Sequence, residues 1–193
     1  MKPQDVLLLL TNNWADWEAA YTIPLVNSVP MYTVKTVAVD KQAKVSAGGL
    51  RVEIDHTLDE YQDLSSAAML ILPGGFDWQN DRHDAIAAFV KKAMDAKVPI
   101  AAICGATIFM GKHGLLDHVK HTGDELELFQ KEEGYAGQDN YVSAQVVADG
   151  GVITANETAA LEFARAILGQ LDIGADEALD GWYGYFKDGM AQQ

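Results

Sequence analysis

The segment Ile100-Ala101-Ala102-Ile103-Cys104-Gly105-Ala106 decides the fold of this 193-residue chain. Its four leading apolar residues are typical of a strand buried on both faces of a sheet. Small residues follow the cysteine, and the pattern from Gly105 to His113 predicts a helix. A strand that leads through a cysteine directly into a helix resembles a nucleophile elbow, in which a tight turn presents the side chain at the edge of an α/β sheet.

Outward from this segment, short apolar runs alternate with longer runs of helical periodicity. We expect further strands at residues 5–10, 32–39, 68–72 and 98–103 and helices at 14–29 (bent by Pro24), 81–96 and 158–168. Residues 45–52 predict a short hairpin beside the main sheet, 119–122 a strand, and 124–132 a helix capped by Asp124. Asp149-Gly150-Gly151 predicts a tight turn between strands at 142–147 and 151–155. The alternation predicts a layered α/β sandwich formed by one domain, residues 1–193.

Composition limits the classes of function. Lys and Arg number 14 against 28 Asp and Glu, a net charge of −14, which argues against nucleic acid because a phosphate backbone needs a basic face. One cysteine excludes an internal disulfide and suits a reducing cytoplasm. No apolar run approaches the ~18 residues of a membrane span, so we expect no membrane partner. The chain has no phosphate-binding loop, dinucleotide fingerprint or zinc-type cysteine pair, so we expect neither cofactor nor metal.

The candidate site lies where the strands end, since ligands bind at the carboxyl edge of open α/β sheets. A helix N-terminus directly after Cys104 favours a nucleophilic thiolate, although a buried structural cysteine is the alternative. The amides of Gly74 and Gly75 could join that of Gly105 as an oxyanion site, or the glycines could simply form a turn. Glu18, if desolvated beside the thiol, could stay protonated and donate a hydrogen bond to it. The alternative for Glu18 is a solvated acid at a helix start.

Together these residues resemble the ThiJ/PfpI superfamily, within the class I glutamine-amidotransferase-like fold. The resemblance rests on the order and spacing of five stretches, Ala15-Asp16-Trp17-Glu18, Val45 to Gly49, Ile71 to Gly75, Ala101 to Gly105 and Asp149 to Thr154. It implies a flavodoxin-like three-layer sandwich with a mostly parallel central sheet, usually a homodimer. It also implies a reactive Cys104, a hydrogen bond from Glu18 to the thiol, and an oxyanion site at Gly75 and Gly105.

The chain departs from the family pattern in its histidines. Protease-like members carry a histidine directly after the cysteine, where this chain has Gly105. Other members supply one just after the strand that corresponds to residues 119–122, and that position falls on Asp124. His121, three residues earlier, is the nearest histidine, so His121 and Asp124 are the candidates for a third catalytic group. This pattern argues against peptidase activity.

Three classes of function remain open. The first is a cysteine-dependent hydrolase or lyase that acts on a small carbonyl or amide by hydrolysis, hydration or glyoxalase-type rearrangement. The second is a non-catalytic redox or electrophile stress sensor, because an exposed low-pKa thiol oxidises readily. The third is a holdase or dimeric binding partner, with an aromatic-rich tail for packing or for a subunit interface at Trp182, Tyr183, Tyr185 and Phe186. We favour the enzyme.

Overall fold

A computed structural model describes residues 3–78 and 83–190, and its centre is a seven-stranded sheet of order β5-β2-β1-β6-β7-β9-β8. The strands are β1 (Gln4–Leu9), β2 (Tyr32–Ala38), β5 (His56–Thr57), β6 (Ala67–Leu72), β7 (Ile100–Ile103), β8 (Val146–Asp149) and β9 (Val152–Ala155). Every neighbouring pair is parallel except β8 and β9. The mostly parallel sheet predicted from the sequence is therefore confirmed, and β5 adds an edge strand that the sequence analysis missed.

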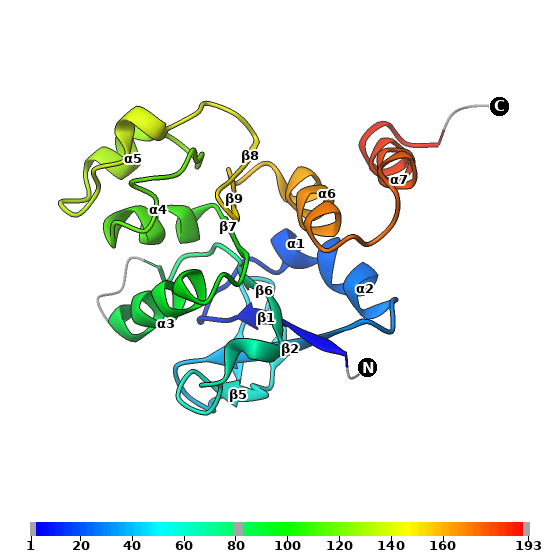
Figure 1. Ribbon diagram of the computed structural model, residues 1–193, viewed down its shortest axis with the longest axis horizontal. Coiled ribbons are helices and arrows are strands. Elements are labelled where there is room, and N and C mark those ends of the chain that lie inside the picture. Colours follow the sequence, from blue (N-terminus) through cyan, green and yellow to red (C-terminus); the bar gives the residue numbers. More distant parts are fainter. Residues whose placement is uncertain (1–2, 79–82, 191–193) are drawn as a thin grey trace.

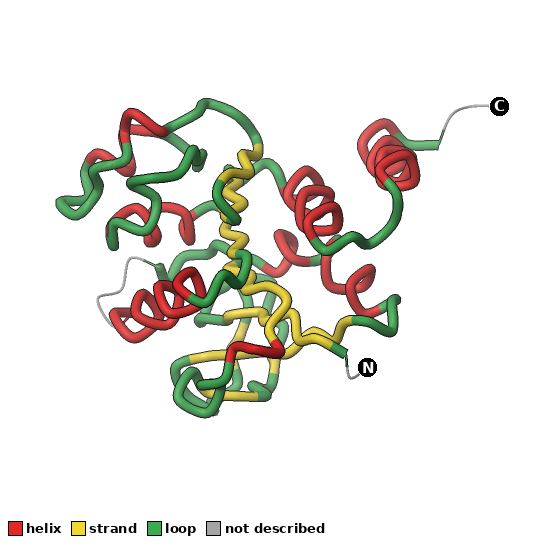
Figure 2. The backbone as a smooth tube through the Cα atoms, viewed as in Figure 1, coloured by secondary structure: helices red, strands yellow, loops and turns green. Residues whose placement is uncertain are grey.

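Helices cover both faces of this sheet, as predicted (Figures 1 and 2). One layer consists of α1 (Asp16–Ala19), α2 (Thr22–Asn27) and α6 (Ala160–Gln170), and α7 (Asp176–Asp188) lies outside α6. The other layer consists of α3 (Asp84–Asp95), α4 (Gly105–Lys112) and α5 (Leu126–Gln130). Short 3₁₀ turns occupy Leu64–Ser66 and Gln138–Asn140.

The apolar run of β1 shows why two helical layers are needed. Side chains alternate across a strand, so Leu7 and Leu9 pack into the core beneath α3 and α4. Val6, Leu8 and Leu10 pack into the opposite core, beneath α6. A strand with no polar face is stable only between two such layers.

The predicted hairpins are present. Gly150 and Gly151 take φ of 57° and 81° between the antiparallel strands β8 and β9, the positive values that this tight turn requires. The strand before it begins later than predicted, at Val146. Residues 44–52 form the small antiparallel pair β3 (Lys44–Val45) and β4 (Arg51–Val52) beside the main sheet.

Two predictions for the helices differ from the structure. The helix expected at 14–29 is two short helices, and Pro24 lies in the first turn of α2, where its missing N–H needs no partner. Helix α3 is described from Asp84, and the predicted start at Asp81 lies outside the described residues. No helix of the described chain is long and apolar enough to cross a membrane.

Residues 119–124 also differ from the prediction. They form no strand and make only an isolated bridge between His121 and Tyr141. The reason is that Thr122 makes hydrogen bonds through side chains in place of strand pairing. Its N–H donates to Thr154 Oγ1, and its hydroxyl donates to the Ala144 carbonyl. Asp124 does not cap α5, because its Oδ1 accepts a hydrogen bond from the Glu157 N–H at 2.7 Å instead.

Candidate functional site

Cys104 stands between the end of β7 and the first residue of α4, which confirms the predicted strand–cysteine–helix geometry. Its backbone has φ of 54° and ψ of −131°, a conformation that residues other than glycine rarely adopt. Hydrogen bonds hold this strained residue from both sides. Its N–H donates to the Ala155 carbonyl at 3.0 Å, and its carbonyl accepts from the Thr107 hydroxyl at 2.7 Å. Strain maintained in this way is typical of functional positions.

Two of the three predicted oxyanion amides meet at the sulfur. The backbone N–H groups of Gly75 and Gly105 both interact with the Cys104 thiol and lower its pKa. The amide of Gly74 instead donates to Glu18 Oε2 at 2.6 Å. Gly75 has a φ of 134°, and a Cβ there would lie 2.4 Å from the Asn13 carbonyl oxygen. Glycine at position 75 thus allows the loops after β1 and β6 to meet beside the sulfur.

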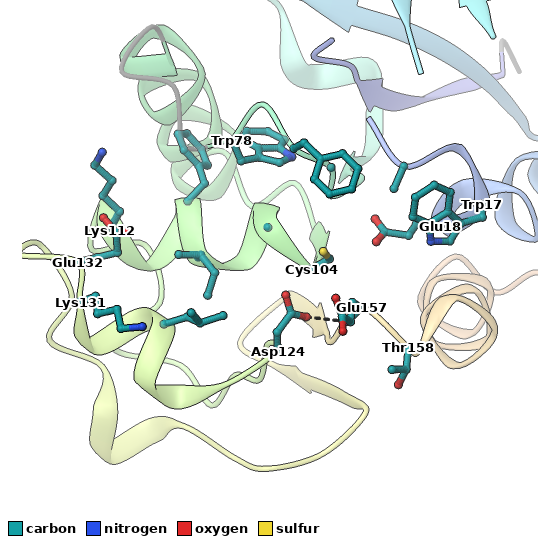
Figure 3. Close-up of a pocket in the computed structure, with 17 residues that line it drawn as sticks. Trp17, Glu18, Trp78, Cys104, Lys112, Asp124, Lys131, Glu132, Glu157 and Thr158 are labelled. Atoms are coloured by element: carbon teal, nitrogen blue, oxygen red, sulfur yellow. Dashed lines mark hydrogen bonds between the residues drawn. The ribbon is translucent and has the colours of Figure 1, made fainter. Parts of the chain in front are cut away.

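Glu18 is buried, at 1% exposure, and its carboxyl group faces the Cys104 thiol (Figure 3). Burial raises the pKa of Glu18 to about 7; the Gly74 amide and the thiol oppose this rise, whereas Asp124 and Glu157 add to it. Among the described residues, Oε1 has no partner that satisfies hydrogen-bond geometry. Glu18 is therefore a desolvated acid beside the sulfur that can hold a proton near neutral pH.

Asp124 and Glu157 approach the sulfur from the loops before α5 and after β9. One oxygen of each and Cys104 Sγ all lie within 4.8 Å of one another. Asp124 was a candidate from the sequence, whereas Glu157 was placed with the residues that follow the last parallel strand, at the ligand-binding edge of the sheet, but was given no role. A thiolate and two carboxylates at this spacing could also hold a divalent cation, which the sequence did not indicate.

The charge state of Cys104 differs from the sequence-based expectation. Burial raises the pKa of the thiol to about 12, and the negative charges of Glu18 and Asp124 add to the rise. The amides of Gly105 and Gly75 lower the pKa, as expected for a helix N-terminus, but they do not offset burial and like charge. The direction of this shift is opposite to the one expected for a favoured thiolate, and Cys104 is a thiol beside a carboxyl group whose pKa, about 7, lies near neutral pH.

His121 lies away from this constellation. It is fully buried, its Nδ1 is bonded to the Val119 carbonyl, and its Nε2 is bonded to the Tyr135 hydroxyl, each at 2.8 Å. Its ring packs against Phe129 and Tyr141. None of the five histidines is among the described residues that line the cavity over Cys104. The structure brings Asp124, but not His121, to the sulfur.

The cavity over Cys104 has a volume of about 810 Å³ and two chemically different ends. Glu18, Asp124 and Glu157 surround the sulfur, while Lys112, Lys131 and Glu132 lie together at the opposite end (Figure 3). Aromatic and aliphatic side chains form the cavity walls, at Trp17, Phe76, Trp78, Ile108, Phe109 and Leu128. This shape fits a small, partly apolar molecule held with one end at the thiol.

The fold and the elbow define a class of α/β protein with a partly buried cysteine at the carboxyl edge of its sheet. Comparison with known proteins makes the class specific, because the model of the DJ-1/PfpI family matches residues 4–170. The chain belongs to the DJ-1/PfpI family.

Individual relatives agree with this assignment over nearly the whole chain. YoaZ of Bacillus subtilis (strain 168), named as an uncharacterized protease, is 36% identical over 191 residues, which cover 95% of this chain and 90% of that protein. A thiJ/pfpI family protein from Bacillus anthracis has a TM-score of 0.89 at 35% identity, covering 97% of this chain and 92% of that one. DJ-1 superfamily protein Atu0886 from Agrobacterium tumefaciens has a TM-score of 0.88 at 30% identity, covering 96% and 98%.

Proposed function

We propose that this protein is a cysteine-dependent enzyme for a small carbonyl or amide compound, in which Glu18 moves the proton of Cys104. The observation that carries the proposal is the buried Glu18 carboxyl facing the thiol, with a pKa raised by burial to about 7. A general acid–base group is most effective when its pKa lies near the working pH. Glu18 thus supplies what an imidazole supplies in other cysteine enzymes.

The proposed step moves one proton and forms one bond. The Glu18 carboxylate takes the proton of the Cys104 thiol as Sγ attacks the carbonyl carbon, and the C=O π bond opens onto oxygen. The amides of Gly75 and Gly105, which point at the sulfur region, hydrogen-bond the oxyanion. Glu18 then returns the proton to that oxygen, which completes a hemithioacetal with no net change of charge.

Carbonyl addition is favoured over amide cleavage at this site. An aldehyde or ketone needs the proton that Glu18 carries on the oxygen beside the sulfur, whereas an amide needs that proton delivered to its leaving nitrogen. The names of relatives such as YoaZ suggest a hydrolase, but no described histidine lines the cavity to protonate an amine. We therefore propose hydratase or glyoxalase-type chemistry first and amide hydrolysis second, with peptidase activity disfavoured.

The charge state of Cys104 also separates the enzyme from a peroxide sensor. Peroxide oxidises the thiolate, and burial together with the carboxylates near Cys104 raises the thiol pKa to about 12. A sensor would need the opposite shift. We expect intact-mass analysis after mild peroxide to show slower addition at Cys104 than at the same thiol in the unfolded chain.

A substrate screen tests the proposal. Small aldehydes, α-oxoaldehydes and amides are offered at pH 7.5, with a chelator present, to wild type, Cys104→Ser, Glu18→Gln and Glu162→Gln. Glu162 is the control acid because it pairs with Lys187 on the outer helices, away from the cavity. We expect turnover of a carbonyl compound to vanish in Cys104→Ser, to fall about 10²- to 10⁴-fold in Glu18→Gln, and to persist in Glu162→Gln. Equal turnover by wild type and Cys104→Ser would overturn the proposal.

A further inference from the structure

Negative charge is concentrated around the reacting sulfur. Asp124 and Glu157 each place an oxygen within 4.8 Å of Cys104 Sγ and of each other. Between described residues, neither carboxylate takes part in an ion pair, and the hydrogen bond of Asp124 comes from a neutral backbone N–H. The lysines of the cavity lie at its other end (Figure 3). An electrophile that reaches the sulfur must therefore pass two carboxylates that no cation of the described residues pairs with.

A second feature of the same site calls for a hydrogen-bond donor. Glu18 is 1% exposed, and its Oε1 lacks a partner of suitable geometry among the described residues while the carboxyl faces the sulfur. When Glu18 is a carboxylate, this buried oxygen without a donor is costly, so a ligand that supplies a donor there gains affinity. The exposed faces of Trp17 and Phe76 on the cavity wall would also favour a cation over an anion.

We infer that the site selects carbonyl compounds whose reacting end is uncharged or positively charged and carries a hydrogen-bond donor, and that Asp124 and Glu157 exclude carboxylate-bearing electrophiles. The inference deepens the proposed function by naming the substrate class. A carboxylate about 5 Å from a charged electrophile changes the rate at which that electrophile reacts with the sulfur. The change lies between about fourfold and a few hundredfold, depending on the effective dielectric constant. Each carboxylate contributes such a factor, favourable for a cation and unfavourable for an anion.

The single cysteine allows a direct test with thiol reagents that differ only in charge. Cys104 is treated with methanethiosulfonates bearing a trimethylammonium-ethyl or a sulfonato-ethyl group, and modification is followed by intact mass. Each rate is divided by that of the unfolded protein, which removes the intrinsic difference between the reagents. The cation-to-anion ratio of the two normalised rates also cancels changes in thiol pKa, so a merely structural effect of a substitution does not move it.

We expect a normalised ratio of about tenfold or more in wild type. Asp124→Asn and Glu157→Gln should each lower it severalfold, and the control Glu162→Gln should leave it unchanged. A wild-type ratio near one, or a ratio that survives both substitutions, would overturn the inference. The proposed function would fail separately. In that case the substrate screen would show no Cys104-dependent turnover of any carbonyl compound, while the cation-to-anion ratio of modification rates would stay high.

Discussion

At the scale of single residues, Cys104 and Glu18 form one proton-sharing unit. Burial raises the pKa of both groups, so neither is charged by preference at the centre of the site. Loss of one proton from the pair leaves mainly the Glu18 carboxylate and the Cys104 thiol, with a minor form in which the proton sits on Glu18 and the sulfur is a thiolate. Under the proposed mechanism, this pair would keep a reactive thiolate available without a permanently ionised cysteine.

The raised pKa of Glu18 predicts a stability difference that depends on pH. The folded protein holds the Glu18 proton up to about pH 7, whereas the unfolded chain releases it near 4.5, so stability is full below 4.5 and falls as pH rises through 7. The shift corresponds to about 3 kcal/mol. Glu18→Gln lacks this titration, so its free energy of unfolding should improve relative to wild type by up to that amount between pH 5 and pH 8, as urea unfolding would measure.

Glu162→Gln is the control for this measurement. Burial raises the pKa of Glu162, but hydrogen bonds from Lys187 and Tyr183 reverse the effect and leave it lowered. Glu162 is then ionised in both folded and unfolded chains from pH 5 to 8, and the variant should show a constant offset there. A constant offset for Glu18→Gln as well would show that Glu18 is not a desolvated acid.

At the scale of elements, the site depends on the contact between the loops after β1 and β6. Gly75 bridges to Trp14, and a Cβ at position 75 would lie 2.7 Å from the Trp14 Cα. Gly49, in the turn between β3 and β4, also has a positive φ, of 84°, but no atom lies within 4 Å of its Cβ position. Alanine at position 49 would therefore meet backbone strain alone, whereas alanine at position 75 would meet both backbone strain and a steric clash.

We predict that Gly75→Ala costs far more stability than Gly49→Ala. Gly49→Ala should lose about 1 kcal/mol, the usual cost of a side chain at positive φ. Gly75→Ala adds a clash with backbone atoms that cannot move without separating the two loops, and should lose about 3 kcal/mol or more. Thermal or urea unfolding measures both. Similar losses would mean that the loop contact does not constrain position 75.

The elements show which features local sequence determines. Uniformly apolar runs predicted β1, β6 and β7, and the paired glycines predicted the turn between β8 and β9. Residues 119–124 were misread because their hydrogen bonds go to side chains and loops distant in sequence, which no local pattern records. The pairing of Asp124 with Glu157 was missed for the same reason, since it joins segments 33 residues apart.

At the scale of the whole molecule, the resemblance predicts a homodimer, and exposed apolar side chains make self-association plausible. The aromatic tail is already anchored within one chain, because Leu179 is buried and Asp180 and Lys187 of α7 pair with Arg165 and Glu162 of α6. Large apolar side chains are exposed near the site mouth and on the small hairpin, at Trp17, Val45, Leu50 and Phe76, and on α7 at Tyr185 and Phe186.

We predict a mass twice that of the 20.9 kDa chain in light scattering after size exclusion. The net charge of −14 opposes association at low ionic strength, so the dimer should be favoured by about 0.15 M salt or more, where repulsion between exposed charges is screened. A mass of one chain at micromolar concentration and this salt would contradict the prediction.

The most direct test of the central claim, that Glu18 controls the proton of Cys104, is the pH profile of Cys104 alkylation by iodoacetamide in wild type and Glu18→Gln. With Glu18 titrating at about 7, the wild-type rate should rise through an inflection near pH 7 and level off, because the minor thiolate form becomes a constant fraction. Glu18→Gln should lose this inflection and keep a single rise at higher pH. Identical profiles for the two proteins, with one ordinary inflection near the ~8.5 of a free thiol, would contradict the account.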